Sequence, residues 1–364
     1  MKILFWGDIM PGGILPYTNT DPLSPNIKNC IGEADLVIGT LECAIGDGLP
    51  YDPVKMKGRA NIIYAPVCSS DLLTRMRFNI MSLANNHIFD LGMDGLRSTI
   101  DVLNRHQISH TGAGENIEEA LRPVIIDKEG IRIAFIAGCT YDPSQVAYVP
   151  VATKDHYGIA PLEGPEILHQ IKKCKDTCDF VIILAHWGKE YSTFPLKSTK
   201  RLSEDLIEAG ADLIIGTHTH MVQPKAFIKR KQVFFSLGNG LFPDFLMTPP
   251  RPIWYPKSTE ISIGAFPVTK EYPYPVEETI LRKWPKSSRT GMIVITSVYK
   301  EHMVSSERFI ELSDENTISI VDAFCLKSKL RVIGLFLQTA IYDEGLLIRK
   351  GRNLLSRIKR KLIN

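Results

Sequence analysis

Short apolar runs separated by amphipathic stretches dominate the first two-thirds of the chain. Such runs, about 4–8 residues long, are typical of buried strands in a sheet that helices cover. They fall at 2–6, 35–41, 78–84, 180–185 and 212–215. Apolar residues recur at helical spacing in 93–106 and 198–209. The pattern predicts an α/β fold.

Three further pairs of apolar runs predict β-hairpins, because each pair is joined by a short polar turn. They are 123–126 with 131–137, 226–228 with 233–237, and 290–298 with 308–312. The stretch from 330 to the end has helical periodicity. We therefore expect one large domain over 1–312 and a C-terminal helical extension over 313–364.

Residues 243–288 differ from the rest of this domain. Proline is dense here, which disfavours regular helix and central strand. The segment is also rich in aromatic residues, which disordered linkers lack: Phe245, Trp254, Tyr255, Phe266, Tyr272 and Tyr274. We expect an ordered insertion that lies over the body and either lines a substrate pocket or only covers the scaffold.

Composition places the chain among ordinary globular proteins, with 44% hydrophobic and 23% charged residues. The apolar run at the N-terminus is too short for a signal peptide, and no run approaches the ~18 residues of a spanning helix. The seven cysteines are scattered. They predict reduced, buried thiols and a cytoplasmic protein.

The positive charge is concentrated in the C-terminal tail. Residues 349–364 hold seven Lys or Arg and no acid, which leaves 36 basic and 40 acidic residues in the body. Leu354, Leu355, Ile358 and Leu362 share one helical face. This pattern is typical of a helix on an anionic membrane surface, at the inner face of the membrane in a cytoplasmic protein, but also of a solvated or protein-docking helix. The body has no nucleic-acid motif.

Candidate metal ligands follow the predicted strands. In open α/β sheets, sites form at the carboxyl ends of strands. The polar residues that fall there are Asp8, Glu42, Asn85, Asn86, His87, His186, His218 and His220. Carboxylate, amide and imidazole groups together suit one or two divalent ions such as Mn, Fe or Zn.

His218 and His220 are the centre of this set. In extended backbone, residues i and i+2 point to the same side, so both rings can reach one metal or two adjacent metals. Glu42 is the candidate for a carboxylate that bridges two ions. Two such ions ~3.5–4 Å apart can activate a water and stabilise both the attacking and the leaving oxygen.

The ordered series of motifs resembles the CapA family, which is named for poly-γ-glutamate capsule synthesis and is related to calcineurin-like metallophosphoesterases. The blocks that carry the resemblance are GDIM (7–10), TLECAIG (40–46), SLANNHIFDLGMDGL (82–96), HTGAGENIEEA (110–120), AHWGKEY (185–191), GADLIIGTHTHMVQP (210–224) and FFSLGNGLF (234–242). The resemblance implies a four-layer α/β/β/α metallophosphoesterase-like sandwich around a di-metal centre.

The resemblance also implies roles for individual residues. Asp8 and His220 would bind the first metal, and Asn86, His186 and His218 the second. Glu42 stands where phosphoesterases usually place a bridging Asp. Met10 stands where they usually place a His, so the first metal loses one ligand. His87 would be a general acid oriented by Asp90.

Four more residues are candidates for contact with substrate. Asn85 either touches substrate or holds its turn, and Asn239 either faces the site or holds a turn. Glu190 and Tyr191 follow the HWG motif and are candidates for substrate contact.

Because Met10 and Glu42 depart from the phosphoesterase pattern, we expect chemistry on a peptide-like or γ-glutamyl polymer, by amide hydrolysis or transfer, rather than on a phosphate ester. A metal-dependent epimerase acting at a peptide Cα–H is an alternative. A non-catalytic capsule-assembly component at the membrane is another.

Overall fold

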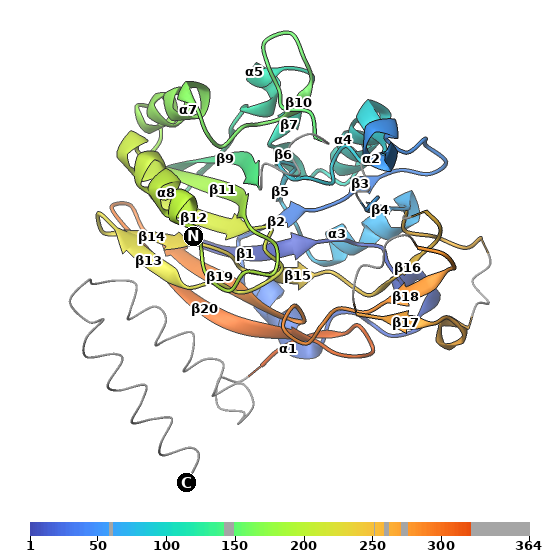
Figure 1. Cartoon of the computed structure of the whole chain (residues 1–364). Helices are drawn as coiled ribbons and strands as arrows, with labels where there is room; N and C mark the ends of the chain where they lie inside the picture. Colours follow the sequence, from blue (N-terminus) through green and yellow to red (C-terminus); the bar gives the residue numbers. More distant parts are fainter. Residues whose placement is uncertain (58–60, 142–148, 251, 258–261, 271–275, 322–364) are drawn as a thin grey trace, which may run out of the picture.

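The protein is a mixed α/β protein with several sheets, seen here in a computed structural model (Figure 1). The structure describes residues 1–57, 61–141, 149–250, 252–257, 262–270 and 276–321. Two large sheets contain most of the strands, and they position the residues discussed below.

The first sheet has eight strands in the order β21-β20-β19-β1-β2-β5-β6, with β15 also paired to β1. Strand β1 runs parallel to β2 and antiparallel to β19. The strands are β1 Lys2–Ile9, β2 Leu36–Leu41, β5 Ile80–Ser82, β6 Ser109–Thr111, β15 Asn239–Leu241, β19 Thr290–Val298, β20 Met303–Leu312 and β21 Ile318–Ile320.

The second sheet has six strands in the order β13-β14-β12-β11-β9-β8. Its central strands β9, β11, β12 and β14 are parallel, and β8 and β13 add antiparallel edges. The strands are β8 Val124–Lys128, β9 Ile131–Tyr141, β11 Phe180–Gly188, β12 Leu213–Thr217, β13 Lys225–Ile228 and β14 Lys231–Phe234.

Strand β11 shows why its sequence is continuously apolar. Ile182 and Leu184 belong to the core that the two sheets share, whereas Val181 and Ile183 belong to a second core under helices α7 (Pro165–Lys175) and α8 (Lys197–Ala209). Both faces of the strand are therefore buried, as in other parallel sheets. In Figure 1, α7 and α8 lie beside this sheet, and α1 (Pro25–Gly32) lies at the opposite end of the view.

Shorter elements connect and cover these sheets. The helices are α2 Pro53–Lys57, α3 Asp71–Arg75, α4 Gly92–Arg105 and α5 Ile117–Ala120, with 3-10 turns η1 Leu15–Tyr17, η2 Val67–Ser70 and η3 Ile263–Ala265. The short strands are β3 Ala44–Ile45, β4 Tyr64–Ala65, β7 Ala113–Gly114 and β10 Gly158–Ile159.

The apolar pattern located the main strands, but the 243–288 insertion holds more regular structure than its prolines predict. Strands β16 (Phe245–Met247), β17 (Val268–Thr269) and β18 (Ile280–Arg282) form a small sheet of their own. Short strands escape the proline restriction because they lie between the prolines. The insertion is anchored by Asp244, whose carboxylate accepts two bonds from Arg289 Nη2, at 2.6 and 2.7 Å.

The region after residue 312 begins as sheet, not helix. Strand β21 pairs antiparallel with β20, so residues up to 320 extend the first sheet. The expected helix from 330 and the basic tail 349–364 lie outside the described residues. No helix in the described part of the chain has the length and apolar character that crossing a membrane requires.

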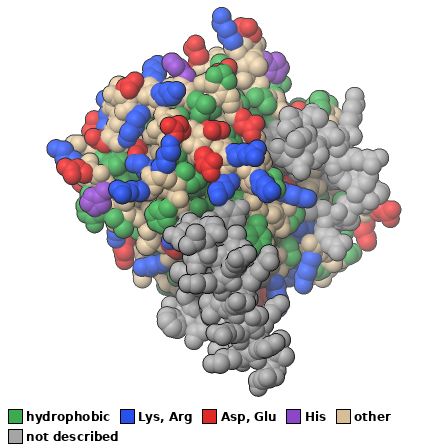
Figure 2. Space-filling model, turned by 60° about the vertical axis from the view of Figure 1, so that its left-hand side comes forward, with side chains coloured by type: hydrophobic (Ala, Val, Ile, Leu, Met, Phe, Trp, Pro, Cys, Tyr) green, Lys and Arg blue, Asp and Glu red, His purple; other side chains and the backbone are tan. Residues whose placement is uncertain are grey.

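The distribution of surface charge and the state of the cysteines agree with the composition of the body. Basic and acidic side chains are interspersed on the face drawn in Figure 2. The cysteines in the described ranges are free thiols, and Cys68 is the exposed one among them.

Candidate metal centre

The candidate ligands come from both large sheets. Asp8 lies in β1, Glu42 directly follows β2, and Asn86 follows β5 in the first sheet. His186 lies in β11 of the second sheet, and the histidine pair follows β12. The ligands therefore do not line the edge of one sheet, because the ends of two facing sheets supply them. A hydrogen bond from the His218 amide to Asp8 Oδ2, 2.9 Å long, joins the two sheets there.

The ligand atoms fall into two groups that share one carboxylate. Glu42, His186 and His218 have ligand atoms within 4.8 Å of one another, and so do Asp8, Glu42 and His220. All five side chains are buried. The arrangement can hold one ion in each group, with Glu42 between them.

The carboxylate oxygens fit a bound cation. Asp8 Oδ1 and both oxygens of Glu42 are buried and have no hydrogen-bond partner among the described residues. A buried carboxylate without a partner is strongly unfavourable, so it is normally paired or bound to a metal. Burial raises the pKa of Asp8 to about 7. Burial and the neighbouring charge of Asp8 raise the pKa of Glu42 well above its usual value. A divalent cation would reverse this penalty.

The histidines are suited to be neutral ligands. Burial lowers the pKa of His186 well below its usual value and that of His220 to about 4. Both are therefore unprotonated at neutral pH, which is the form that binds metals.

Polar neighbours orient these rings. His186 Nδ1 lies 3.0 Å from the Thr217 hydroxyl, and its Nε2 lies 2.9 Å from Asn86 Oδ1. Adjacent ligands on an octahedral ion with ~2.1 Å bonds are about 3 Å apart, so these two atoms can share one ion. His220 Nδ1 lies 2.8 Å from Asn239 Oδ1, and the Asn239 amide donates to the Ser288 carbonyl. Such partners fix the orientation of metal-binding histidines.

The i, i+2 prediction assumed extended backbone at His218 and His220. That assumption is wrong. His218 has φ 91° and His220 has φ 53°, both in the left-handed region that favours glycine. Each such residue costs on the order of 1–3 kcal/mol, and such strain concentrates at functional sites. The two rings reach different ligand groups because the chain turns sharply after β12, not because of strand alternation.

His87 lies beside the ligand groups and is oriented by Asp90. Its Nδ1 is 2.7 Å from Asp90 Oδ2, and its ring is mostly buried. Its Nε2 has no hydrogen-bond partner in the described part of the chain. Asp90 also accepts from the Ile63 amide and from Lys55 Nζ. The sequence reasoning missed Lys55, and no motif or spacing around it pointed to the site.

The remaining candidates differ in their surroundings. Asn85 donates to the Leu41 carbonyl and accepts from the His87 amide, so both of its polar ends hold the turn. Glu190 is partly exposed and its charge acts on Asp8, Glu42 and His220. Tyr191 is 39% exposed, with its ring centroid 5.8 Å from that of His220.

Two further contacts show how the insertion and Met10 relate to the centre. Trp284 of the insertion packs on His220, with ring centroids 4.9 Å apart. No motif or spacing in the sequence indicated this contact. Met10 Sδ accepts from the Gly12 amide at 3.2 Å and lies 3.8 Å from the Tyr255 hydroxyl.

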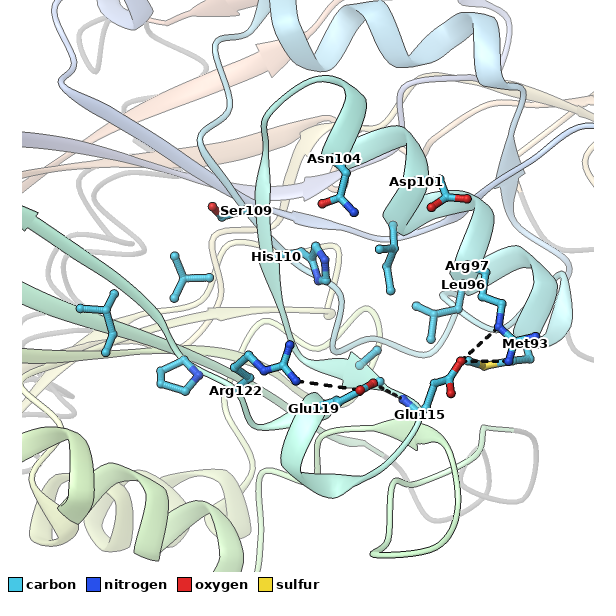
Figure 3. A pocket seen from close by; sticks show the side chains of 16 residues that line it. Met93, Leu96, Arg97, Asp101, Asn104, Ser109, His110, Glu115, Glu119 and Arg122 are labelled. Carbon is cyan, nitrogen blue, oxygen red and sulfur yellow. Dashed lines mark hydrogen bonds and ion pairs between the residues drawn. The ribbon is translucent and has the colours of Figure 1, made fainter.

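A separate groove of about 610 Å³ lies between α4 and strands β6 and β8 (Figure 3). Its arginines face acidic partners: Arg97 contacts Glu115 at 2.9 Å and Arg122 contacts Glu119 at 3.9 Å. None of the candidate ligands lines it. The groove is therefore distinct from the candidate centre.

The part of the chain that holds the motifs is similar to known proteins. A family model described as "Bacterial capsule synthesis protein PGA_cap" matches residues 2–244. The chain is 33% identical over 254 residues to "Capsule biosynthesis protein CapA" of Bacillus anthracis, covering 65% of this chain and 58% of that protein. It is 28% identical over 243 residues to "PGA biosynthesis protein CapA" of Bacillus subtilis (strain 168), covering 65% of this chain and 62% of that protein.

The chain thus spans about three-fifths of the length of these curated relatives. Among solved structures, a hypothetical protein from Thermus thermophilus aligns with a TM-score of 0.47 and 14% identity. That alignment covers 85% of this chain and 99% of the other.

Proposed function

The chain belongs to the bacterial capsule synthesis protein (PGA_cap) family, and from that premise we propose that it is a metal-dependent enzyme acting on a peptide-like or γ-glutamyl polymer. The reaction is amide hydrolysis or transfer, linked to poly-γ-glutamate or capsule synthesis. The names of the two CapA relatives support that link.

One observation carries the proposal: two buried ligand groups share Glu42, and both oxygens of its carboxylate lack a hydrogen-bond partner among the described residues. We assign Asp8 and His220 to one ion, and Asn86, His186 and His218 to the other, with Glu42 bridging. The two facing sheets and their outer helices support a four-layer sandwich of the metallophosphoesterase type.

A divalent ion held there would polarise the carbonyl of a bound amide as a Lewis acid. The chain's own residues supply the proton chemistry. Asp90 Oδ2 lies 2.7 Å from His87 Nδ1 and holds a proton on that nitrogen. His87 Nε2 is then the atom that donates a proton to the leaving amine. Tyr191 and Glu190 lie at the more exposed side of the centre and are assigned to substrate contact, as is Asn239 through its position beside His220.

Peptide-like substrates are preferred over phosphate esters for a reason specific to this chain. Met10 offers only a thioether, a poor ligand for a hard ion, and its sulfur accepts from the Gly12 amide and lies 3.8 Å from the Tyr255 hydroxyl. In the assignment proposed above, the Asp8 group has three protein ligands (Asp8, Glu42 and His220), and the other group has four, because Asn86 completes it. One well-held Lewis acid and a proton donor suffice to activate an amide.

The test is a mass-balance experiment with Mn²⁺-loaded protein and a γ-linked glutamyl peptide in heavy water. Hydrolysis releases a new amine and adds one water, and Glu42→Gln or His186→Ala should abolish it. His169→Ala, which removes an exposed histidine on α7, is the control and should react like wild type.

Two results would contradict amide hydrolysis or transfer. Incorporation of one deuterium without any other change in mass would identify an epimerase acting at Cα–H. Unchanged peptide, together with polymer export that is unaffected by Glu42→Gln in cells, would identify a non-catalytic assembly component.

A further inference from the structure

Lys55 is a lysine whose side chain is only 2% exposed, close to the candidate centre. Its Nζ donates to Asp90 Oδ1 and to the backbone carbonyl of Asn86. Removing an ammonium group from water costs several kcal/mol unless its partners compensate. The two contacts therefore account for the burial of Lys55.

The segment that carries Lys55 is fixed against the loop that carries His87. The Asp52 amide donates to the Asp90 carbonyl at 2.9 Å. The Lys55 amide donates to Asp52 Oδ1 at 2.8 Å and so starts helix α2. These two bonds fix the backbone that carries Lys55 beside Asp90, within reach of the lysine's ammonium group.

This single ammonium group holds two residues with different proposed roles. It binds the backbone of Asn86, whose side-chain oxygen lies 2.9 Å from His186 Nε2. It also binds Asp90, whose other oxygen accepts from His87 Nδ1. Loss of Lys55 would leave the Asn86 carbonyl without this donor. It would also leave Asp90, which orients His87, held by the Ile63 amide alone on its other side in the described part of the chain.

We propose that Lys55 is a positioning residue of the candidate centre, which holds Asn86 as a metal ligand and His87 as a proton donor. The part that concerns Asn86 as a metal ligand rests on the proposed function. The other part, the orientation of His87, is a property of the metal-free protein and can be tested separately.

The test compares three variants of the full chain with wild type. Lys55→Met removes the charge and the donors, and Lys55→Gln keeps two N–H donors without the charge. Lys175→Met is the matched control, because Lys175 pairs with buried Asp212 at 2.8 Å and neither residue belongs to the candidate ligand groups. Mn²⁺ affinity is measured by calorimetry, and the His87 Nδ1–H proton is followed by NMR without metal.

We expect Lys55→Met to weaken Mn²⁺ binding about 10–100-fold, the usual effect of removing a partner that orients a ligand. The His87 Nδ1–H signal should exchange faster and broaden. Lys55→Gln should recover part of both effects, and it carries the test if Lys55→Met does not fold. Lys175→Met should change neither measurement.

Wild-type Mn²⁺ affinity and a wild-type His87 signal in a folded Lys55 variant would overturn the inference. Equal weakening of Mn²⁺ binding by Lys175→Met would also overturn it, because the effect would then be general destabilisation. If wild type binds no Mn²⁺, the proposed function fails, and the NMR signal alone decides the role of Lys55. Its loss in Lys55→Met supports the inference, and its retention rejects it.

Discussion

Replacing Glu42 with glutamine should act in opposite directions in the presence and absence of a cation. In metal-free protein, Glu42 is fully buried and both of its oxygens lack a hydrogen-bond partner among the described residues. Its raised pKa means that the folded state must bind a proton or bury a charge at pH 7, and either costs stability. We expect metal-free Glu42→Gln to be as stable as wild type or more stable.

With a cation, the sign reverses. At a Mn²⁺ concentration 100 times the Kd, binding stabilises the folded state by about 2.7 kcal/mol. Glu42 belongs to both ligand groups, so we take an affinity loss of roughly 100-fold for the variant. The stabilisation then falls to about 0.4 kcal/mol. The difference of about 2.3 kcal/mol corresponds to about 3 °C in Tm for a chain of this length.

Thermal unfolding with and without Mn²⁺ measures both effects. Glu307→Gln is the matched control, because Glu307 pairs with Lys225 at 2.8 Å away from the centre. Its change in Tm should be the same with and without metal. The reasoning is refuted if Mn²⁺ raises the Tm of Glu42→Gln as much as that of wild type. It is also refuted if metal-free Glu42→Gln is several degrees less stable than wild type.

Three further predictions follow from the same geometry. Because the pKa of Asp8 is raised to about 7, the metal-free folded state retains a proton that the unfolded state releases near pH 4. Its stability should therefore fall from about pH 4 to 7, and Asp8→Asn should flatten this part of a pH–denaturation series. Met10→Leu should leave Mn²⁺ stoichiometry unchanged and cost less than about 1.5 kcal/mol, since the Met10 sulfur is engaged by the Gly12 amide and a thioether is a poor ligand for a hard ion; loss of an ion measured by elemental analysis would contradict this. His87→Gln should lower kcat on a γ-glutamyl peptide about 10²–10⁴-fold with Mn²⁺ affinity unchanged, and weaker Mn²⁺ binding would instead make His87 a ligand.

The apolar pattern predicted much of the fold, and the motif order predicted a set of ligand-type side chains at strand ends. Continuous apolar runs such as 180–185 can be read locally, because burial on both faces leaves no polar positions. Five of the residues that the motifs singled out lie close together and are buried: Asp8, Glu42, His186, His218 and His220.

What could not be predicted depends on contacts between distant segments. The burial of Lys55 requires Asp90, which lies 35 residues away in sequence. The left-handed backbone at His218 is unfavourable locally, and long-range bonds such as that to Asp8 offset the cost. Strand β21 is only three residues long, and its pairing with β20 defines it more than its own sequence does.

The position of β1 in the first sheet also sets an order for folding during synthesis. β1 leaves the ribosome before β2, which can pair with it after a short delay. The other edge of β1 is filled by β15, which pairs at Asp8 and Ile9, and by β19, which starts at Thr290 and pairs with residues 2–5. Both strands are made after the last candidate ligand, His220. The nascent chain therefore carries all the candidate ligands while the strand that bears Asp8 still has an open edge. Because open edges pair with other chains, we expect the growing polypeptide to need protection from aggregation until β19 emerges.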